Sequence, residues 1–208
     1  MQDRQTGQTG LLQAFFCVIS LLLVAAAQPA RAQPLAWREH TYPSSRRDHA
    51  MVYDVRRGVH VMLGGRDPSS AAPGDTWEWN GASWTRRAVT GPSPRSGHRM
   101  AYDTARGVTV LFGGQPTSGP FLGDTWEWDG VTWTRRDVPG PSIRALHSMA
   151  YDSARGVTVL FGGFNGGTRN AETWEWNGAT WTRRLVTGPT ARSLNSMTYD
   201  AQRGLTVL

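Results

Sequence analysis

Short apolar runs and glycine-containing turns alternate along the chain, and no stretch keeps a helical period. Val108–Phe112 is β-branched and apolar on both faces, which is typical of a strand buried between neighbours. Thr125–Trp128 alternates polar and aromatic residues with the period of two that indicates a strand. Arg99–Tyr102 and Trp133–Arg136 complete a predicted set of four strands. Gly, Pro and Thr interrupt every segment before a 3.6-residue period could begin, so we expect an all-β fold.

Turn residues join these strands into antiparallel hairpins. Asp103–Gly107 combines an Asp that can bond its own backbone with a Gly that is free to take positive φ. Asp129-Gly130 lies between the last two strands, and Asn80-Gly81 and Asn177-Gly178 occupy the corresponding place in other parts of the chain. Asn-Gly and Asp-Gly between strands are strong hairpin signals.

The hairpin also decides where the tryptophans point. With a loop of either two or four residues, Trp77, Trp79 and Trp84 share one face of the sheet, and Glu78 lies on the other. The equivalent residues are Trp126, Trp128, Trp133, Trp174, Trp176 and Trp181. Three large aromatics on one face need cover from another sheet, so we predict a core between sheets rather than a platform for carbohydrate stacking.

The whole group of strands is repeated along the chain. Four tyrosines mark the repeat at spacings of 49, 49 and 48 residues: Tyr53, Tyr102, Tyr151 and Tyr199. A fixed period of about fifty residues indicates a modular array, in which each unit buries its apolar face against its neighbours. Four antiparallel strands in a repeat of this length form the blade of a β-propeller.

A family resemblance rests on the residues around these strands. Gly64-Gly65, Gly113-Gly114 and Gly162-Gly163 each close an apolar strand, a tryptophan strand follows, and an Arg and a His precede the first strand. This arrangement resembles the kelch repeat, and Asp-Thr-Trp-Glu-Trp-(Asn/Asp)-Gly resembles exported bacterial kelch-like proteins. The resemblance covers residues 37–208 and departs from the usual kelch unit in one respect. Kelch units usually have Tyr where Trp79, Trp128 and Trp176 stand, which affects core packing more than the fold.

The resemblance implies a kelch-type β-propeller of four-stranded antiparallel blades, with about three full blades and partial end blades. The implied units are residues 46–94, 95–143 and 144–191 as blades and 192–208 as a partial fourth blade. Trp37–His40 aligns with Trp84–Arg87, so we expect residues 33–45 to hold an outer strand that can close the ring. The last copy stops before a Gly-Gly pair, so we expect a truncated chain with missing blades. The alternative is a small closed or self-associating ring, because end blades would expose apolar flanks.

The first 32 residues are predicted to be a signal peptide. A polar start precedes the apolar run Leu11–Ala27, and Ala30-Arg31-Ala32 supplies a cleavage pattern that places the mature start at Gln33. An uncleaved membrane anchor is the alternative, although the run is at the lower limit for a span. Cys17 is the single cysteine. We therefore expect a secreted or periplasmic bacterial protein without disulfides, and with no stable membrane span after cleavage.

The charge favours some partners over others. All 22 basic residues are Arg, against 16 Asp and Glu, which gives a net charge of +6. Much of the surplus comes from the pairs Arg86-Arg87, Arg135-Arg136 and Arg183-Arg184 rather than from one basic patch, so we expect no nucleic-acid partner. We interpret these pairs as charges on an outer strand that prevent edge-to-edge pairing. An acidic polysaccharide or an anionic cell surface fits the charge better than nucleic acid does.

No residue set predicts catalysis. His49, His98 and His147 could meet around a channel as a metal ring, but a position that recurs in every repeat is more simply structural. The repeated carboxylates are interpreted in the same way, because a catalytic pair needs two different environments. The copper site of galactose oxidase, a kelch-ring enzyme, requires a cysteine that the mature chain lacks. We therefore expect no enzyme activity, metal or cofactor. The alternative is a fragment of an exported propeller enzyme, glycan-active or oxidase-like, with its catalytic residues in missing blades.

The copies differ most in the loop after each Gly-Gly pair. In an up-and-down blade this loop emerges on the same face as the link to the next blade, around Val89–Pro94, and variable loops on a rigid frame often carry binding. We expect Phe121 and Phe164 to be exposed there. The candidate binding residues are Arg66, Asp67, Gln115, Phe121, Phe164, Asn165, Arg169 and Asn170. The predicted function is an exported protein- or polysaccharide-binding or scaffolding module, and self-association of an incomplete ring is a further expectation.

Overall fold

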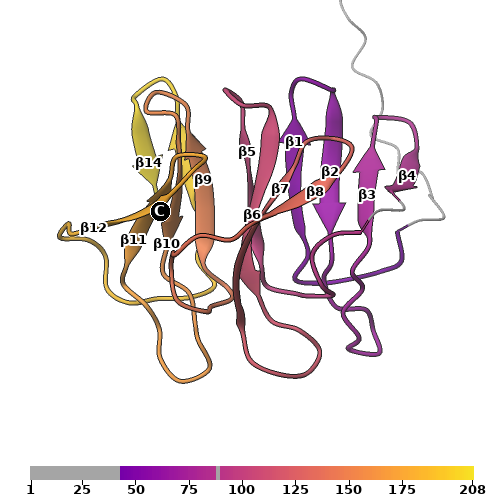
Figure 1. The fold of residues 1–208 in the computed structure, drawn as a ribbon, viewed down its shortest axis with the longest axis horizontal. Helices are drawn as coiled ribbons and strands as arrows, with labels where there is room; N and C mark the ends of the chain where they lie inside the picture. Colours follow the sequence, from indigo (N-terminus) through magenta and orange to yellow (C-terminus); the bar gives the residue numbers. More distant parts are fainter. Residues whose placement is uncertain (1–42, 88–89) are drawn as a thin grey trace, which may run out of the picture. The chain divides into compact units, whose positions relative to one another are not determined.

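The computed structural model describes residues 43–87 and 90–208, and in this part of the chain all regular structure is β (Figure 1). The first sheet has strands β1 (Ala50–Asp54), β2 (Val59–Leu63), β3 (Thr76–Trp79) and β4 (Trp84–Arg87). The second has β5 (Arg99–Asp103), β6 (Val108–Gly114), β7 (Leu122–Trp128) and β8 (Trp133–Arg136). The third has β9 (Ser148–Asp152), β10 (Val157–Phe161), β11 (Thr173–Trp176) and β12 (Trp181–Arg184). A two-stranded sheet of β13 (Thr198–Asp200) and β14 (Leu205–Val207) follows.

Each four-stranded sheet is an antiparallel meander in which strands pair in chain order. The prediction of an all-β fold made of four-stranded antiparallel sheets is therefore confirmed for the described residues. These residues contain no helix long and apolar enough to cross a membrane. The predicted signal peptide (1–32), the outer strand at Trp37–His40 and the link residue Val89 lie outside the described residues.

One predicted boundary differs from the structure. We expected the second strand of each repeat to end at Gly-Gly, but β6 runs through Gly114, which pairs with Leu122 of β7. The register shifts between Phe112 and Gly114, so this hairpin contains a β-bulge. The bulge lengthens β6 and β7, the two strands of this hairpin, and shortens the loop between them.

The turn chemistry explains the hairpins between the last two strands of each sheet. Asn80 begins a four-residue loop whose ends are joined by a hydrogen bond from the Asn80 amide to the Ser83 carbonyl, 3.3 Å. The Asn80 side-chain oxygen accepts from the amides of Ala82 and Ser83, at 2.9 and 2.8 Å. Asp129 and Asn177 make the same contacts in the next two sheets. A side-chain oxygen thus replaces backbone partners in the turn, as expected for Asn and Asp.

The register places the tryptophans on one face, as predicted. Trp79 pairs directly with Trp84, and Glu78 pairs with Thr85 on the opposite face. In the second sheet, Trp128 and Trp133 are buried and their rings lie 5.5 Å apart. Their centroid distance is in the range of favourable aromatic contact.

The core lies between successive sheets rather than within one of them. Trp128 and Trp133 of the second sheet pack against Val61 and Leu63 of the first. A second cluster joins the third sheet to the second in the same way, through Trp176, Trp181, Val110 and Phe112. The prediction that the tryptophans form a core between sheets is confirmed for the second and third copies.

The first strands of successive sheets lie beside one another, β1 next to β5, β5 next to β9, and β9 next to β13. The two ends of this series keep apolar side chains in solvent. Met51 is 50% exposed where the equivalent Met100 is 6% exposed, and Val207 is 50% exposed where Val110 is fully buried. No sheet covers these end faces among the described residues. Self-association stays a prediction, and these faces are the surfaces through which we expect it.

The glycine pair at the end of the second strand is required by the contact between neighbouring repeats. Gly113 has φ of 66°, and a Cβ there would collide with the backbone carbonyl of Arg144 in the next repeat. We expect Gly113→Ala to lower the free energy of unfolding by about 2–4 kcal/mol, from positive φ and the clash together. Gly119 also has positive φ, but a Cβ there would meet nothing within 4 Å. Gly119→Ala therefore isolates the backbone contribution, and urea unfolding that shows equal losses for both variants would contradict the role of the clash.

Candidate functional site

A buried carboxylate on the third strand joins each sheet to the next. Glu78 is 2% exposed and accepts from Arg57 at 2.6 Å and from Arg87 at 2.8 Å. On its other side it accepts from the indole N–H of Trp128 in the second sheet, 3.1 Å. Glu127 repeats this arrangement toward the third sheet and accepts from Trp176 at 2.9 Å. With every oxygen directed at a frame residue, these carboxylates are structural, as predicted.

The arginine pairs of the outer strands have two different roles. The second arginine of each pair bonds the buried glutamate of its own sheet; these are Arg87, Arg136 and Arg184. The interpretation of these residues as edge charges was therefore incomplete, because they also neutralise a carboxylate that the fold buries. The first members include Arg135, which pairs only with the exposed Asp137 at 2.9 Å among the described residues.

A buried arginine stands before the first strand of the second and third sheets. The Arg95 side chain is fully buried, bonds the Gly113 carbonyl at 2.9 Å and pairs with Asp124 at 2.6 Å. Arg144 makes the equivalent contacts with Gly162 and Glu172. Burial acts to raise the pKa of Asp124, but the Arg95 guanidinium outweighs it and holds that pKa below its usual value. The Arg thus links the Gly-Gly turn to the start of the tryptophan strand.

Two of the three repeated histidines are buried within this frame, and His49 is half-buried. His98 and His147 are fully buried. Burial, together with the charges of Arg95 and Arg99, lowers the pKa of His98 to about 3. His147 also has a pKa well below the ordinary value, first because of burial and then because of Arg99. Both imidazoles are neutral at pH 7. Among the described residues, no three His, Cys, Asp or Glu side chains gather where they could hold a metal.

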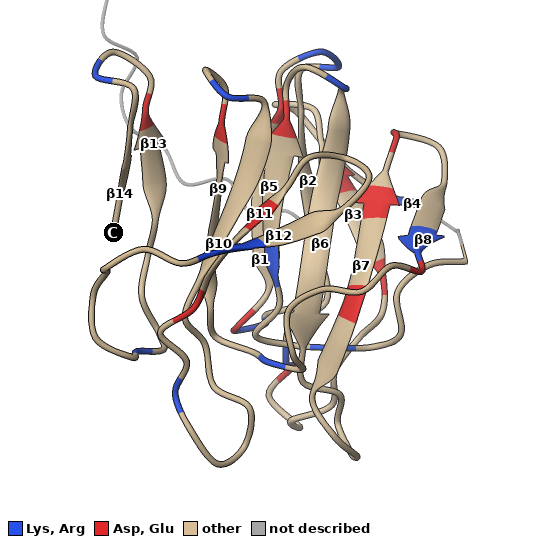
Figure 2. Cartoon of the chain, turned by 60° about the vertical axis from the view of Figure 1, so that its left-hand side comes forward, with Lys and Arg blue, Asp and Glu red and all other residues tan. Residues whose placement is uncertain are grey.

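The turns at the other end of the sheets complete the contacts between repeats. Asp54, at the end of β1, accepts from Arg57 in the following turn at 2.6 Å. Figure 2 shows that β5, β9 and β13 also end in an acidic residue and are followed by a turn with a basic residue. Burial and the neighbouring Asp54 carboxylate raise the pKa of Tyr102 to about 12. The acidic turn of one repeat thus faces the repeat tyrosine of the next. A groove of about 600 Å³ runs along these first strands, lined by residues that include Tyr53, Tyr102 and Tyr151.

A backbone ladder fixes the step from one repeat to the next. The amide of Gly97 donates to the Asp48 carbonyl at 2.8 Å, Leu146 donates to Gly97 at 2.7 Å, and Leu194 donates to Leu146 at 2.8 Å. All four residues have φ between 55° and 63°. Leucine rarely adopts this conformation, so the contact between repeats must hold it there.

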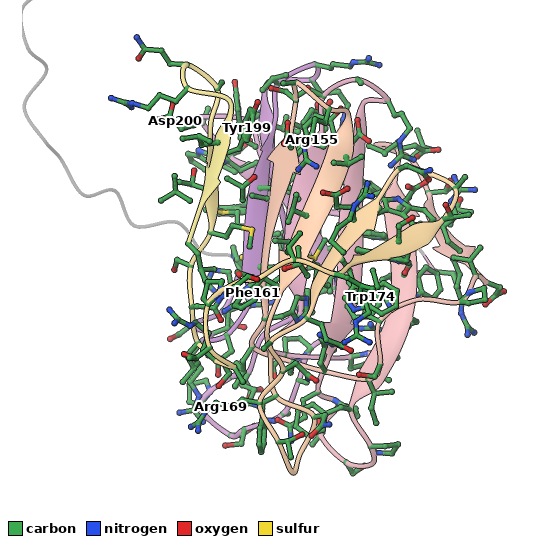
Figure 3. The ribbon with its side chains drawn as sticks, turned by 90° about the vertical axis from the view of Figure 1, so that its left-hand side faces the viewer. Arg155, Phe161, Arg169, Trp174, Tyr199 and Asp200 are labelled. Atoms are coloured by element: carbon green, nitrogen blue, oxygen red, sulfur yellow. The ribbon has the colours of Figure 1, made fainter. Side chains whose placement is uncertain are left out.

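The loops after Gly-Gly emerge together at one end of the sheets, the lower end in Figure 1. Figure 3 places Arg169, from one of these loops, at the end opposite to Arg155, Tyr199 and Asp200. The first residue of each loop also forms a backbone bridge with the residue two before the repeat His or Asn: Arg66 with Arg47, Gln115 with Ser96, and Phe164 with Ala145. The loops therefore lie on the face of the links between repeats, as predicted for the described part of those links. We call this end of the sheets the loop face.

Contacts between neighbouring loops make the loop face continuous. Arg66 donates to Ser96 Oγ at 2.8 Å and to Gln115 Oε1 at 2.9 Å. The rings of Phe121 and Phe164 meet edge to face, with centroids 5.9 Å apart. All three contacts join one repeat to the next.

Other candidate residues shape their own loops. Asp67 accepts from the Ser69 hydroxyl at 2.6 Å and the Ala71 amide at 3.0 Å, and the Ser69 bond is the main cause of its lowered pKa. Asn165 caps its turn by accepting from the Thr168 amide at 2.8 Å. The backbone amide of Asn170 donates to the Gly163 carbonyl at 2.8 Å. These three residues stabilise the conformations of the loops that carry the other candidate binding residues.

The structure corrects one expectation about the loop face. Phe121 and Phe164 are half-buried rather than exposed, because each ring covers the other and Phe164 bridges to Ala145. Arg169 is exposed and reaches Ser193 of the fourth copy at 3.4 Å. The aromatic pair therefore supports the loops and presents only part of its surface.

Two adjoining hollows on the loop face were not predicted. One, of about 230 Å³, is lined by residues that include Ser45, Arg47, Arg66 and Asp67. The other, of about 240 Å³, includes Arg47, Arg66, Ser96 and Gln115. Arg47 was missed because it precedes the repeat motif by two residues and carries no signal of its own. The one available sign was that the first copy has Arg at this position, where the second and third copies have Ser96 and Ala145.

The chain was also compared with known proteins. No protein-family model matches it, and no curated protein matches its sequence.

Proposed function

We propose that this chain is part of an exported kelch-type β-propeller that serves as a binding or scaffolding module, with the loop face as its recognition surface. Residues that suggested the family make contacts between sheets that recur: the Gly65 amide with the Arg95 carbonyl, and the buried glutamate with the next tryptophan. The backbone ladder recurs beside them. A constant step from sheet to sheet is what a ring of blades needs.

One observation carries the choice of a binding role. The residues that repeat are used by the frame, whereas the residues that differ between copies gather on the loop face and line its hollows. Rigid frames with variable loops commonly bind partners through those loops. The neutral, buried histidines and paired carboxylates offer no acid–base pair that would favour catalysis instead.

The test is the binding of fluorescently labelled protein to isolated bacterial envelopes. Phe121→Ala combined with Arg169→Ala should weaken binding about tenfold or more, because both side chains lie on the loop face. The matched control pairs Val55→Ala with Arg203→Ala, which removes an exposed apolar residue and an exposed arginine from the turns at the opposite end.

Protease treatment of the envelopes separates the two classes of partner. Binding that survives the treatment identifies a polysaccharide, and binding that is lost identifies a protein. Equal loss in the loop-face and control variants, both with wild-type melting temperature, would overturn the proposal. So would the absence of envelope binding by the wild-type protein.

A further inference from the structure

Two arginines face each other across a backbone bridge on the loop face. The Arg47 amide donates to the Arg66 carbonyl at 2.9 Å, and the Arg66 amide donates to the Arg47 carbonyl at 2.7 Å. Residues paired in this way project their side chains to the same side, and like charges directly opposite one another are unfavourable. The pair therefore costs stability.

The frame does not require this pair. The equivalent bridges join Ser96 to Gln115 and Ala145 to Phe164, which carry no charge. All three bridges keep the same backbone hydrogen bonds at 2.7–2.9 Å. Only the first copy has a like-charge pair at this position, and the other copies have uncharged residues. This difference indicates that the pair serves in binding rather than in folding.

Among the described residues, no carboxylate makes a close ion pair with either of these two arginines. Arg66 is held by the neutral oxygens of Ser96 and Gln115. The Arg47 side chain is 70% exposed, and its nearest carboxylate is Asp48, at 4.0 Å. Asp67 lies in the first hollow, but its carboxylate accepts from Ser69 and Ala71 of its own loop.

The surroundings of Arg46 add no free charge. Arg46 also lines the first hollow, and it is neutralised by Asp75 at 2.6 Å. The two residues that line both hollows are Arg47 and Arg66, so their shared wall carries two positive charges, while Asp67 lines only the first hollow and Asp48 only the second.

Polar groups beside the arginines indicate the kind of anion. The second hollow also presents the Gln115 amide and the Asp48 carboxylate, whereas the Ser96 hydroxyl in its wall is buried and holds Arg66. These groups can bond sugar hydroxyls, while a guanidinium pair suits a planar carboxylate. Two adjoining hollows on either side of the pair can take successive units of a chain.

We propose that Arg47 and Arg66 bind the carboxylate of a uronic-acid unit in an acidic polysaccharide. The inference rests on the proposed function and names the ligand class of its recognition face. The guanidinium pair holds the carboxylate, and the flanking polar groups orient the sugar ring. Carboxylate binding relieves the repulsion between the arginines, so the ligand also stabilises the loop face.

The test measures binding of trigalacturonate by calorimetry to the full chain. Arg47→Gln should weaken binding at least tenfold, because it removes one of the two guanidinium charges that hold the ligand carboxylate. The matched control is Arg86→Gln, which removes an exposed outer-strand arginine away from both hollows. The control should bind as the wild type does, and raising the salt from low to physiological concentration should weaken wild-type binding. Arg47→Gln should not lower the melting temperature, because it removes a like charge opposite Arg66, and Arg86→Gln should leave it unchanged because Arg86 is exposed.

The outcomes separate this inference from the function on which it rests. Equal weakening by both substitutions would show attraction to overall charge, and absence of trigalacturonate binding would show no site; either result overturns the inference. Equal binding of the neutral galactotriose would exclude a role for the carboxylate, and equal binding of hexaglutamate would exclude specificity for a glycan. If trigalacturonate does not bind while envelope binding still depends on Phe121 and Arg169, the proposed function stands and the proposed ligand class is wrong.

Discussion

Replacing Arg95 by methionine is expected to lower the free energy of unfolding by about 3–5 kcal/mol. The Arg95 side chain is fully buried, and it holds both the Asp124 carboxylate and the Gly113 carbonyl. Methionine fills much of the same volume but leaves Asp124 with the Trp126 indole as its remaining side-chain donor among the described residues. Chemical unfolding at pH 7 measures the loss.

The control for this prediction is Arg47→Met, at an arginine whose side chain is 70% exposed. It should change stability by less than about 0.5 kcal/mol. In the double variant Arg95→Met, Asp124→Asn, part of the loss should be recovered because no unpaired carboxylate remains. A loss below about 1 kcal/mol for Arg95→Met would mean that water or backbone replaces the guanidinium.

The same ion pair sets a pH dependence in strong acid. The folded-state pKa of Asp124 is lowered, so its contribution to stability is present above the unfolded value of about 4 and is lost as pH falls through the folded pKa. Arg95→Met should remove this contribution. Wild type and variant should therefore differ less in stability at pH 2 than at pH 7.

A second large effect is expected from the buried histidines at milder pH. The pKa of His98 is about 3 in the folded protein and about 6.5 in the unfolded chain. Between these values the unfolded chain binds a proton that the folded protein does not, so stability falls as pH falls. His98 alone should cost about 2 kcal/mol between pH 7 and pH 5, and His147 adds a loss of the same sign.

The fourth copy suggests the variant that tests this effect. Asn195 stands at the position of His98 and donates to Ser148 at 2.5 Å. His98→Asn should reduce the slope of stability against pH between 6.5 and 5, whatever it costs at pH 7. A slope equal to that of the wild type would show that His98 does not cause the acid sensitivity. The pH window lies above that of Asp124, so the two groups can be measured separately.

Much of the fold followed from local chemistry. Short β-branched apolar runs and period-two alternation located strands, and Asn-Gly and Asp-Gly located the hairpins. Strand pairing then put Trp79 and Trp84 on one face. The bulge at Gly114 was not predicted, because it depends on how Leu122 pairs across the hairpin. Local signals of this kind act within one repeat, where residues that interact are close in sequence.

The loop face was predicted less completely. Its position followed from the meander, since the second and fourth strands of each sheet end at the same side. The mutual burial of Phe121 and Phe164 did not follow, because the two rings belong to different repeats. Arg47 was missed for another reason: its significance depends on Arg66, of the same repeat, lying opposite it in a bridge outside the regular strands.

The sequence by itself determined the repeat, its antiparallel strands, the turns between them and the face on which the tryptophans lie. Only the tertiary structure decided which carboxylate each arginine neutralises, that His98 and His147 are buried and neutral, and that Arg47 and Arg66 form one like-charge pair. Strand and turn preferences arise from a few neighbouring residues. Ion pairs of the third-strand carboxylates join side chains 9–29 positions apart within one repeat. Burial comes from side chains about fifty positions apart, which the stacking of repeats brings together.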